Sequence, residues 1–126
     1  MRAVDTNVLV RLIVRDDDRQ VAAAEEFVAA GAWASPLALA EAMWVLARVY
    51  GFGASEIARA VDMLLQQDEL TVQDSEAVAA AVVLYRARPA LGFSDCLLLE
   101  LARKAGHLPL GTFDRQLGKV AGTELL

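Results

Sequence analysis

The sequence of 126 residues contains only one cysteine and one histidine. A single cysteine, Cys96, excludes an internal disulfide and is typical of a reducing compartment, so we expect a cytoplasmic protein. The usual zinc sites need three or four nitrogen and sulfur ligands, which this chain does not have. The one histidine, His107, follows Gly106 at an expected helix end and gives little support to a Ser-His-Asp triad. Any bound metal should therefore be a hard cation held by oxygen atoms.

Long apolar runs are also missing. No run approaches the roughly 18–20 residues of a membrane helix, so we expect no membrane association. Arg2 is followed almost at once by Asp5, which does not fit a signal peptide. Neither of the glycine-rich phosphate loops, G-x-x-x-x-G-K-[ST] and G-x-G-x-x-G, is present, which excludes nucleotide-binding folds of those types. We find no linker, low-complexity tract or internal repeat, and we predict a single domain over residues 1–126.

Basic residues are outnumbered: 12 Lys and Arg stand against 17 Asp and Glu, and the formal net charge is −5. This balance argues against sequence-independent binding of nucleic acid. A clustered acidic site that binds a divalent cation is, however, no longer locally negative. Apolar residues make up 56% of the chain, above the ~45–50% typical of soluble domains. Part of this excess could lie on a surface that contacts a partner or a second copy, although much of it is alanine.

Short apolar segments alternate with segments of helical period. Such alternation predicts a three-layer α/β/α fold with a short parallel central sheet. The expected strands are 2–6, 32–35, 70–73, 108–112 and, with weaker support, 123–126. Seven helices are expected: the first starts near Asn7, the second spans 19–30, and the third starts at Pro36. The fourth starts after an N-cap at Ser55, and the fifth runs from 74 or 75 to about 86. The sixth runs from Ser94 to Gly106, and the seventh covers 114–120.

Three acidic residues lie where strands end or helices begin. Asp5 lies at the end of an expected strand and Asp114 follows another, and each could equally serve as a helix N-cap. Asp95 lies in the first turn of a very apolar helix, where Ser94 is expected to be the N-cap and the helix dipole would favour a carboxylate.

Glu41 is the fourth acid, and it stands alone in the apolar segment LALAEAMWVLA. We expect its carboxylate to be desolvated and therefore paired, protonated or metal-bound. The alternative is that Glu41 reaches solvent or pairs with an arginine. Ligands of parallel sheets bind at the carboxyl ends of the strands, so these four acids could converge on one crevice. Oxygen ligands of this kind suit Mg²⁺ or Mn²⁺.

The order of these motifs resembles the PIN domain: DTN after the first strand, a lone glutamate in an apolar helix, FSDCLLL, and GTFDRQL. More narrowly, it resembles the VapC-type toxin ribonucleases of bacterial toxin–antitoxin pairs. The resemblance extends from Val4 to Leu117. The family's acidic positions match Asp5, Glu41, Asp95 and Asp114, and its supporting polar positions match Asn7, Ser94 and Thr112. Cys96 stands where alanine is commoner.

The resemblance implies hydrolysis of RNA with Mg²⁺ or Mn²⁺, leaving a 5′-phosphate and a 3′-hydroxyl. It also implies a homodimer and an inhibitory antitoxin that binds hydrophobic grooves. Asp5, Asp95 and Glu41 are the expected metal ligands, with Asp114 as a ligand or a residue that positions water. Flanking phosphates could contact three arginines that are close in sequence: Arg11, Arg15 and Arg115. Partner surfaces could include the helices from Leu37 to Leu65, with Met43 and Tyr50; we expect Trp44 to be a core residue.

Two other functions are considered. A PIN-like module that acts only by binding would need no metal, but degenerate members usually lose one or more of the acids. A haloacid-dehalogenase-like phosphatase also places an aspartate after the first strand, but it requires a second one where Asn7 stands. A nuclease with a housekeeping role would have much the same sequence as a toxin.

Overall fold

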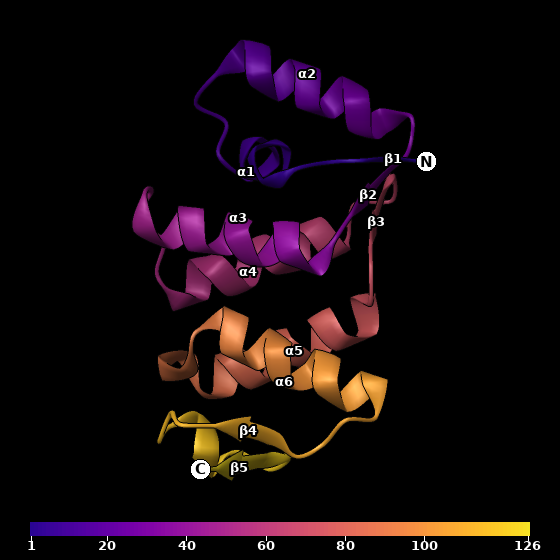
Figure 1. Cartoon of the computed structure of the whole chain (residues 1–126). Coiled ribbons are helices and arrows are strands. Elements are labelled where there is room, and N and C mark those ends of the chain that lie inside the picture. The colour runs from indigo at the N-terminus through magenta and orange to yellow at the C-terminus, as the bar shows by residue number, and fades with distance from the viewer. The chain divides into compact units, whose positions relative to one another are not determined.

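A computed structural model describes all residues from Met1 to Leu126. The chain forms two compact units, Met1–Ser75 and Glu76–Leu126, whose elements are labelled in Figure 1. None of the helices is long and apolar enough to span a membrane. The elements in order are β1 (Arg2–Ala3), α1 (Thr6–Ile13), α2 (Asp18–Ala29), β2 (Ala32–Ala34), α3 (Pro36–Arg48), α4 (Ala54–Leu65), β3 (Leu70–Val72), α5 (Ser75–Ala87), η1 (Pro89–Leu91), α6 (Phe93–Ala105), β4 (Leu110–Thr112), η2 (Leu117–Lys119) and β5 (Thr123–Leu125).

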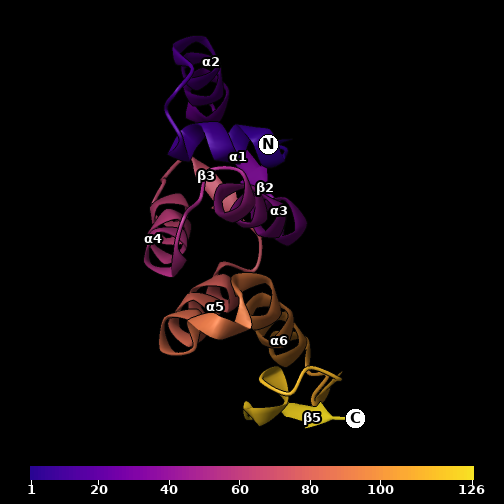
Figure 2. The same ribbon diagram turned by 90° about the vertical axis from the view of Figure 1, so that its left-hand side faces the viewer.

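The first unit contains a parallel three-stranded sheet in the order β1-β2-β3. Arg2 pairs with Ala32 and Ala32 pairs with Leu70. Helices α1 and α2 connect β1 to β2, and helices α3 and α4 connect β2 to β3. Parallel strands require such crossover connections. Helix α1 packs against both α2 and α3, and its place beside α2 is visible in Figure 2.

Most helix starts in the first unit follow the capping rules. The side chains of Asp17 and Ser35 accept hydrogen bonds from the backbone N–H groups of Gln20 and Ala38, and Pro36 occupies the first turn of α3. The prediction of Ser55 as the N-cap of α4 is wrong.

The N-cap of α4 is Gly53. Glu56, three residues further on, accepts a hydrogen bond from the Gly53 N–H at 3.0 Å. The acidic half of a capping box therefore fixes this helix start without a hydroxyl at the N-cap.

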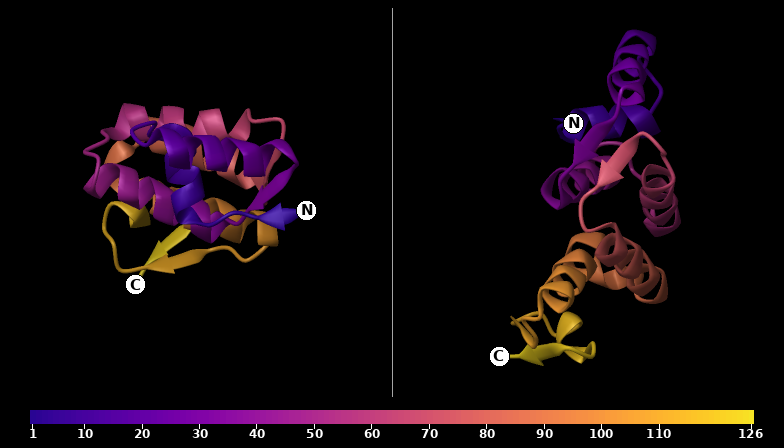
Figure 3. Two further views of the ribbon diagram at one scale, coloured as in Figure 1. Left: turned by 90° about the horizontal axis from the view of Figure 1, so that it is seen from above. Right: turned by 90° about the vertical axis from the view of Figure 1, so that its right-hand side faces the viewer.

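The second unit consists of α5, η1, α6 and a two-stranded parallel pair, β4 and β5, which lie side by side in Figure 3. Ser94 is not the N-cap of α6, contrary to the prediction. Gly92 occupies that position with φ +80° and ψ 147°, a conformation that glycine adopts without a steric penalty. Helix α6 ends at Gly106 in the left-handed conformation, as predicted.

The core is entirely apolar, with no buried polar or charged residue. Met43 belongs to this core, at 3% exposure, and so is not a surface residue. Trp44 was expected in the core, but 58% of it is exposed. Helix α3 packs on both α1 and α4. Its buried face consists of Ala38, Leu39, Ala42, Met43 and Leu46, and Trp44 lies outside this face.

The structure confirms the predicted fold class. Six α-helices and a short parallel three-stranded sheet form a helix-rich α/β fold, consistent with the three-layer α/β/α class. The strands are shorter than expected; β1, for example, ends at Ala3. The predicted helix over 114–120 is also shorter, a single 3₁₀ turn at Leu117–Lys119.

Candidate active site

Asp5 lies between the end of β1 and the start of α1. Val4 continues the pairing of β1 through a 2.9 Å hydrogen bond from its N–H to the Trp33 carbonyl. Asp5 is the N-cap of α1, and its Oδ1 accepts a hydrogen bond from the Val8 N–H at 3.2 Å. The residue is exposed and its second oxygen, Oδ2, has no intramolecular partner. The capping role and a ligand role are thus compatible in one carboxylate.

Glu41 lies in the second turn of α3 and is exposed. The expectation of a desolvated carboxylate is therefore wrong. Exposed Leu37 and Trp44 flank it at helical spacing, and the guanidinium group of exposed Arg48 lies over the Trp44 ring. Glu41 therefore lies on a solvent-facing side of α3 that carries both apolar and charged side chains. Its Oε2 accepts a 2.9 Å hydrogen bond from the Thr6 hydroxyl of α1. This bond ties Glu41 to the residue next to Asp5.

Asp95 is the third residue of α6 and is half-buried. Burial raises the pKa of its carboxyl group above the ordinary value, and the negative charge of Asp114 raises the pKa further. The next residue, Cys96, is fully buried. Burial and the nearby charges of Asp95 and Glu100 raise the pKa of its thiol to about 11, so Cys96 is not a nucleophile.

Asp114 begins the turn after β4. Its Oδ1 accepts hydrogen bonds from the backbone N–H groups of Gln116 at 2.8 Å and Leu117 at 3.0 Å. Its own N–H donates to the Thr112 hydroxyl at 2.9 Å. The turn is therefore held by the side chains of Thr112 and of Asp114 itself. The Oδ2 atom of Asp114 accepts no intramolecular hydrogen bond, and the residue is exposed.

The four predicted acids fall into two pairs, one in each unit. In the first unit, Thr6 links Glu41 to the segment of Asp5; in the second unit, Asp95 and Asp114 are close enough for their charges to interact. None of the four forms an ion pair with an arginine or lysine. No group of three or more His, Cys, Asp or Glu side chains suited to a metal ion is present.

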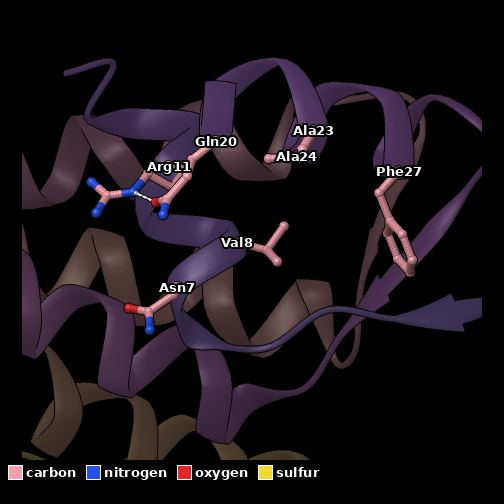
Figure 4. Close-up of a pocket in the computed structure, with 7 residues that line it drawn as sticks. All are labelled: Asn7, Val8, Arg11, Gln20, Ala23, Ala24 and Phe27. Carbon is pink, nitrogen blue, oxygen red and sulfur yellow. Dashed lines mark hydrogen bonds between the residues drawn. The ribbon is translucent and has the colours of Figure 1, made fainter. Parts of the chain in front are cut away.

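The supporting polar residues lie near these acids in the chain. Thr112 holds the Asp114 backbone, as described, and Ser94 is exposed in the first turn of α6. Asn7 is exposed in the first turn of α1 and faces a cavity of about 500 Å³ between α1 and α2 (Figure 4). Thr6 was not predicted to belong to the site, although its position between Asp5 and Asn7 was the available signal. The cavity is lined by Asn7, Val8, Arg11, Gln20, Ala23, Ala24 and Phe27.

The three candidate arginines differ in their intramolecular contacts. Arg11 donates hydrogen bonds to Gln20, to Asp16 at 2.9 Å and to the Tyr50 hydroxyl at 3.0 Å; the bond to Tyr50 is the main cause of its raised pKa. Arg15 pairs with Glu25 of α2. Arg115 is exposed and has no intramolecular ion pair or hydrogen bond, which leaves it the most accessible of the three for a phosphate.

Comparison with known proteins identifies one family. No curated protein and no solved structure shows a significant match to the chain. The model of the PIN domain matches residues 2–123, which includes all four acids and both compact units. PIN domains are generally nucleases and generally use divalent metal ions. The chain therefore belongs to the PIN domain family.

Proposed function

We propose that this protein is a metal-dependent endoribonuclease that hydrolyses phosphodiester bonds of RNA and leaves 5′-phosphate and 3′-hydroxyl ends. The family supports nuclease activity in general. RNA as the substrate, the products and the metal requirement belong to the proposal. We further propose that the two units act together as one PIN domain over residues 1–126 and that the protein works in the cytoplasm.

The observation that carries the proposal is the pair of like charges formed by Asp95 and Asp114. Two carboxylates whose charges interact, with no arginine or lysine paired to either, destabilise each other. A bound cation removes this repulsion and becomes the largest local charge of the site. Two neighbouring carboxylates that are not paired with a positively charged side chain therefore favour the binding of a metal cation.

The donor set fits Mg²⁺ or Mn²⁺. Asp5 and Asp114 each use one carboxylate oxygen for a helix or turn cap, and Glu41 uses one for Thr6. Each retains a second oxygen without an intramolecular partner. Hard oxygen ligands of this kind suit these two ions, and no nitrogen or sulfur ligand is available among them.

The four acids have distinct proposed roles. Asp5, Asp95 and Glu41 would hold the ion, and Asp114 would be a further ligand or would orient the attacking water. The helix-terminal bond of Asp5, the turn bonds of Asp114 and the Thr6 bond of Glu41 orient these three carboxylates before substrate arrives, which reduces the reorganisation needed during reaction. When bound, the ion supplies hydroxide at neutral pH and stabilises charge on the phosphate.

We also propose that the protein is the toxin of a VapBC-type pair, that it forms a homodimer and that a cognate antitoxin inhibits it. The support is the sequence resemblance together with the exposed large apolar side chains of both units, which suit contacts with protein partners. Leu37, Trp44 and Val49 of the α3 region are 68%, 58% and 68% exposed.

A PIN-like module that acts only by binding is the alternative. The retention of all four acids argues against it, and the absence of an internal cation for Asp95 and Asp114 favours a metal site. A magnesium-dependent phosphatase is a weaker alternative, because Asn7 replaces the second aspartate that the reaction would need.

The test is cleavage of a mixed cellular RNA pool by the purified protein in Mg²⁺ or Mn²⁺ and in EDTA. We expect metal-dependent cleavage that is lost in Asp5→Asn and Asp95→Asn, since an amide keeps the shape of the side chain but not its charge. Sequencing the RNA ends identifies the products and the target.

A matched control is Asp62→Asn on α4, which changes an acid outside the proposed site and should leave cleavage intact. A folded protein that neither cleaves RNA nor binds Mn²⁺ would contradict the enzyme proposal and favour the binding module.

A further inference from the structure

Phe113 is the most exposed aromatic side chain of the protein, at 81%. It lies between Thr112 at the end of β4 and Asp114 of the proposed site. Exposure of a large apolar side chain to water is unfavourable, and isolated cases are common, but this one directly precedes a proposed catalytic carboxylate. The mechanism proposed above assigns no role to it.

The backbone that carries Phe113 is fixed. The Asp114 N–H donates to Thr112 Oγ1, Asp114 Oδ1 accepts from Gln116 and Leu117, and the Gly118 N–H donates to the Asp114 carbonyl at 2.9 Å. A side chain presented by such a turn has only two rotatable bonds left to order when a ligand binds, so its contacts cost little conformational entropy.

The residue on the other side of Asp114 complements this aromatic ring. Arg115 is exposed and has no intramolecular ion pair or hydrogen bond. The sequence Phe113-Asp114-Arg115 thus presents an aromatic face, a carboxylate and a guanidinium within three consecutive residues. A nucleotide offers the matching groups in the same short distance: a base with a π face and a phosphate that binds guanidinium groups.

We infer that Phe113 is a positioning residue on which one base of single-stranded RNA stacks, next to the phosphodiester that is cleaved, while Arg115 contacts a neighbouring phosphate. This inference rests on the proposed function. Stacking on a side chain requires a base that is free of its duplex neighbours, so the substrate class is unpaired RNA such as a loop or a single strand. The polar neighbours of Phe113, half-buried Thr112 and exposed Asp114, suit a base better than an apolar protein groove.

The experiment compares two ligands of equal charge and length in the cleavage-deficient Asp5→Asn protein. One is an eight-nucleotide single-stranded RNA, and the other is an eight-unit ribose-phosphate chain without bases. Fluorescence anisotropy gives the ratio of the two affinities. We expect RNA to bind more tightly, and we expect Phe113→Leu to reduce that ratio by roughly fivefold or more, the lower end of the stacking effect per base.

Three further variants separate the contributions. Phe113→Tyr retains the aromatic face and should keep the ratio. Arg115→Gln should weaken both ligands by the same factor, because it removes a phosphate contact and not a base contact. Val83→Ser changes an apolar side chain of α5 that is 70% exposed and should leave both affinities unchanged.

The outcomes distinguish this inference from the proposed function. If the wild-type protein cleaves RNA with metal but Phe113→Leu leaves the affinity ratio unchanged, the inference is wrong and the function stands. An unchanged ratio together with an altered molar mass in light scattering would assign Phe113 to a protein interface instead. If the wild-type protein shows no metal-dependent cleavage and the Asp5→Asn protein binds neither chain, both proposals fail.

Discussion

At the Asp95 carboxyl group, burial and the charge of Asp114 act in the same direction and raise the pKa. The folded protein therefore binds more protons than the unfolded chain at pH values between the ordinary and the raised pKa. The contribution of Asp95 to stability falls as the pH rises through this window and stays at its lower value above it. Metal binding requires the ionised form, so metal affinity should rise with pH over the same window.

Asp95→Asn should therefore separate stability from metal binding. Without metal, we expect the free energy of unfolding at pH 7 to stay the same or to rise by at most about 0.5 kcal/mol, because the site is partly exposed to solvent. The melting temperature should accordingly stay the same or rise slightly. The stabilisation by Mn²⁺ should be lost. Thermal melts with Mn²⁺ and with EDTA measure both effects.

Asp16→Asn is a useful comparison, since it changes an acid of the α1–α2 loop that pairs with Arg11. It should leave the Mn²⁺ effect intact. A large loss of stability of Asp95→Asn in EDTA would show that this carboxylate has a mainly structural role.

The Thr6 hydroxyl holds Glu41, so Thr6→Val should release that carboxylate while keeping the shape of the side chain. Because the bond is at the surface, we expect a loss of no more than about 1 kcal/mol in stability. The rate of RNA cleavage should fall more strongly, by about tenfold, if Glu41 must be oriented. Thr6→Ser restores the hydroxyl and should restore cleavage; equal activity of the Val and Ser variants would contradict this role.

At the scale of elements, the Arg103 side chain joins α6 to the segment before the C-terminal strand. Arg103 Nε donates to both carboxylate oxygens of Glu100 at 3.2 Å, and its Nη2 donates to the Ala121 carbonyl at 3.1 Å. Glu100 is only 11% exposed. Arg103 fixes the segment before β5, which pairs with the strand leading to Asp114.

Arg103→Met keeps the length of the side chain but removes these bonds. We expect a loss of about 1–2 kcal/mol in the free energy of unfolding, since charged hydrogen bonds are lost and Glu100 remains largely covered. Urea denaturation measures the loss. The comparison is Arg59→Met, which changes an exposed side chain of α4 and should have little effect. Similar midpoints for the two variants would contradict the bridging role.

The sequence predicted the order and type of nearly every element, because helical period, proline and capping residues agree with one another along this chain. It failed where backbone conformation replaced a side-chain signal. Helices α4 and α6 start at Gly53 and Gly92, so the nearby serines were misleading. The exposure of Glu41 and Trp44 was not predicted, because the apolar sequence of α3 does not indicate which side of the helix faces solvent. That depends on which other elements pack against the helix.

At the scale of the whole molecule, the four acids of the proposed site were predicted from sequence, and two of them belong to each compact unit. Sequence spacing carries little information about long-range convergence, which depends on tertiary packing. We propose one PIN domain, and the prediction is a single cooperative thermal transition. Differential scanning calorimetry should give equal calorimetric and van't Hoff enthalpies.

Mn²⁺ should shift this transition upward as a whole, and EDTA should reverse the shift, because the proposed ligands come from both units. Two separate transitions, of which metal shifts only one, would contradict the single-domain proposal and would restrict the metal site to one pair of acids.

The buried Cys96 has a practical consequence for labelling chemistry. With a pKa of about 11, only about one thiol in ten thousand is ionised at pH 7, and the side chain is fully covered. The natural protein should therefore react very slowly with maleimides. A cysteine introduced at an exposed position, such as Ala79 on α5 or Arg59 on α4, would be the one reactive thiol of the molecule. Attached fluorophores or spin labels could then follow metal and RNA binding without removal of a native residue.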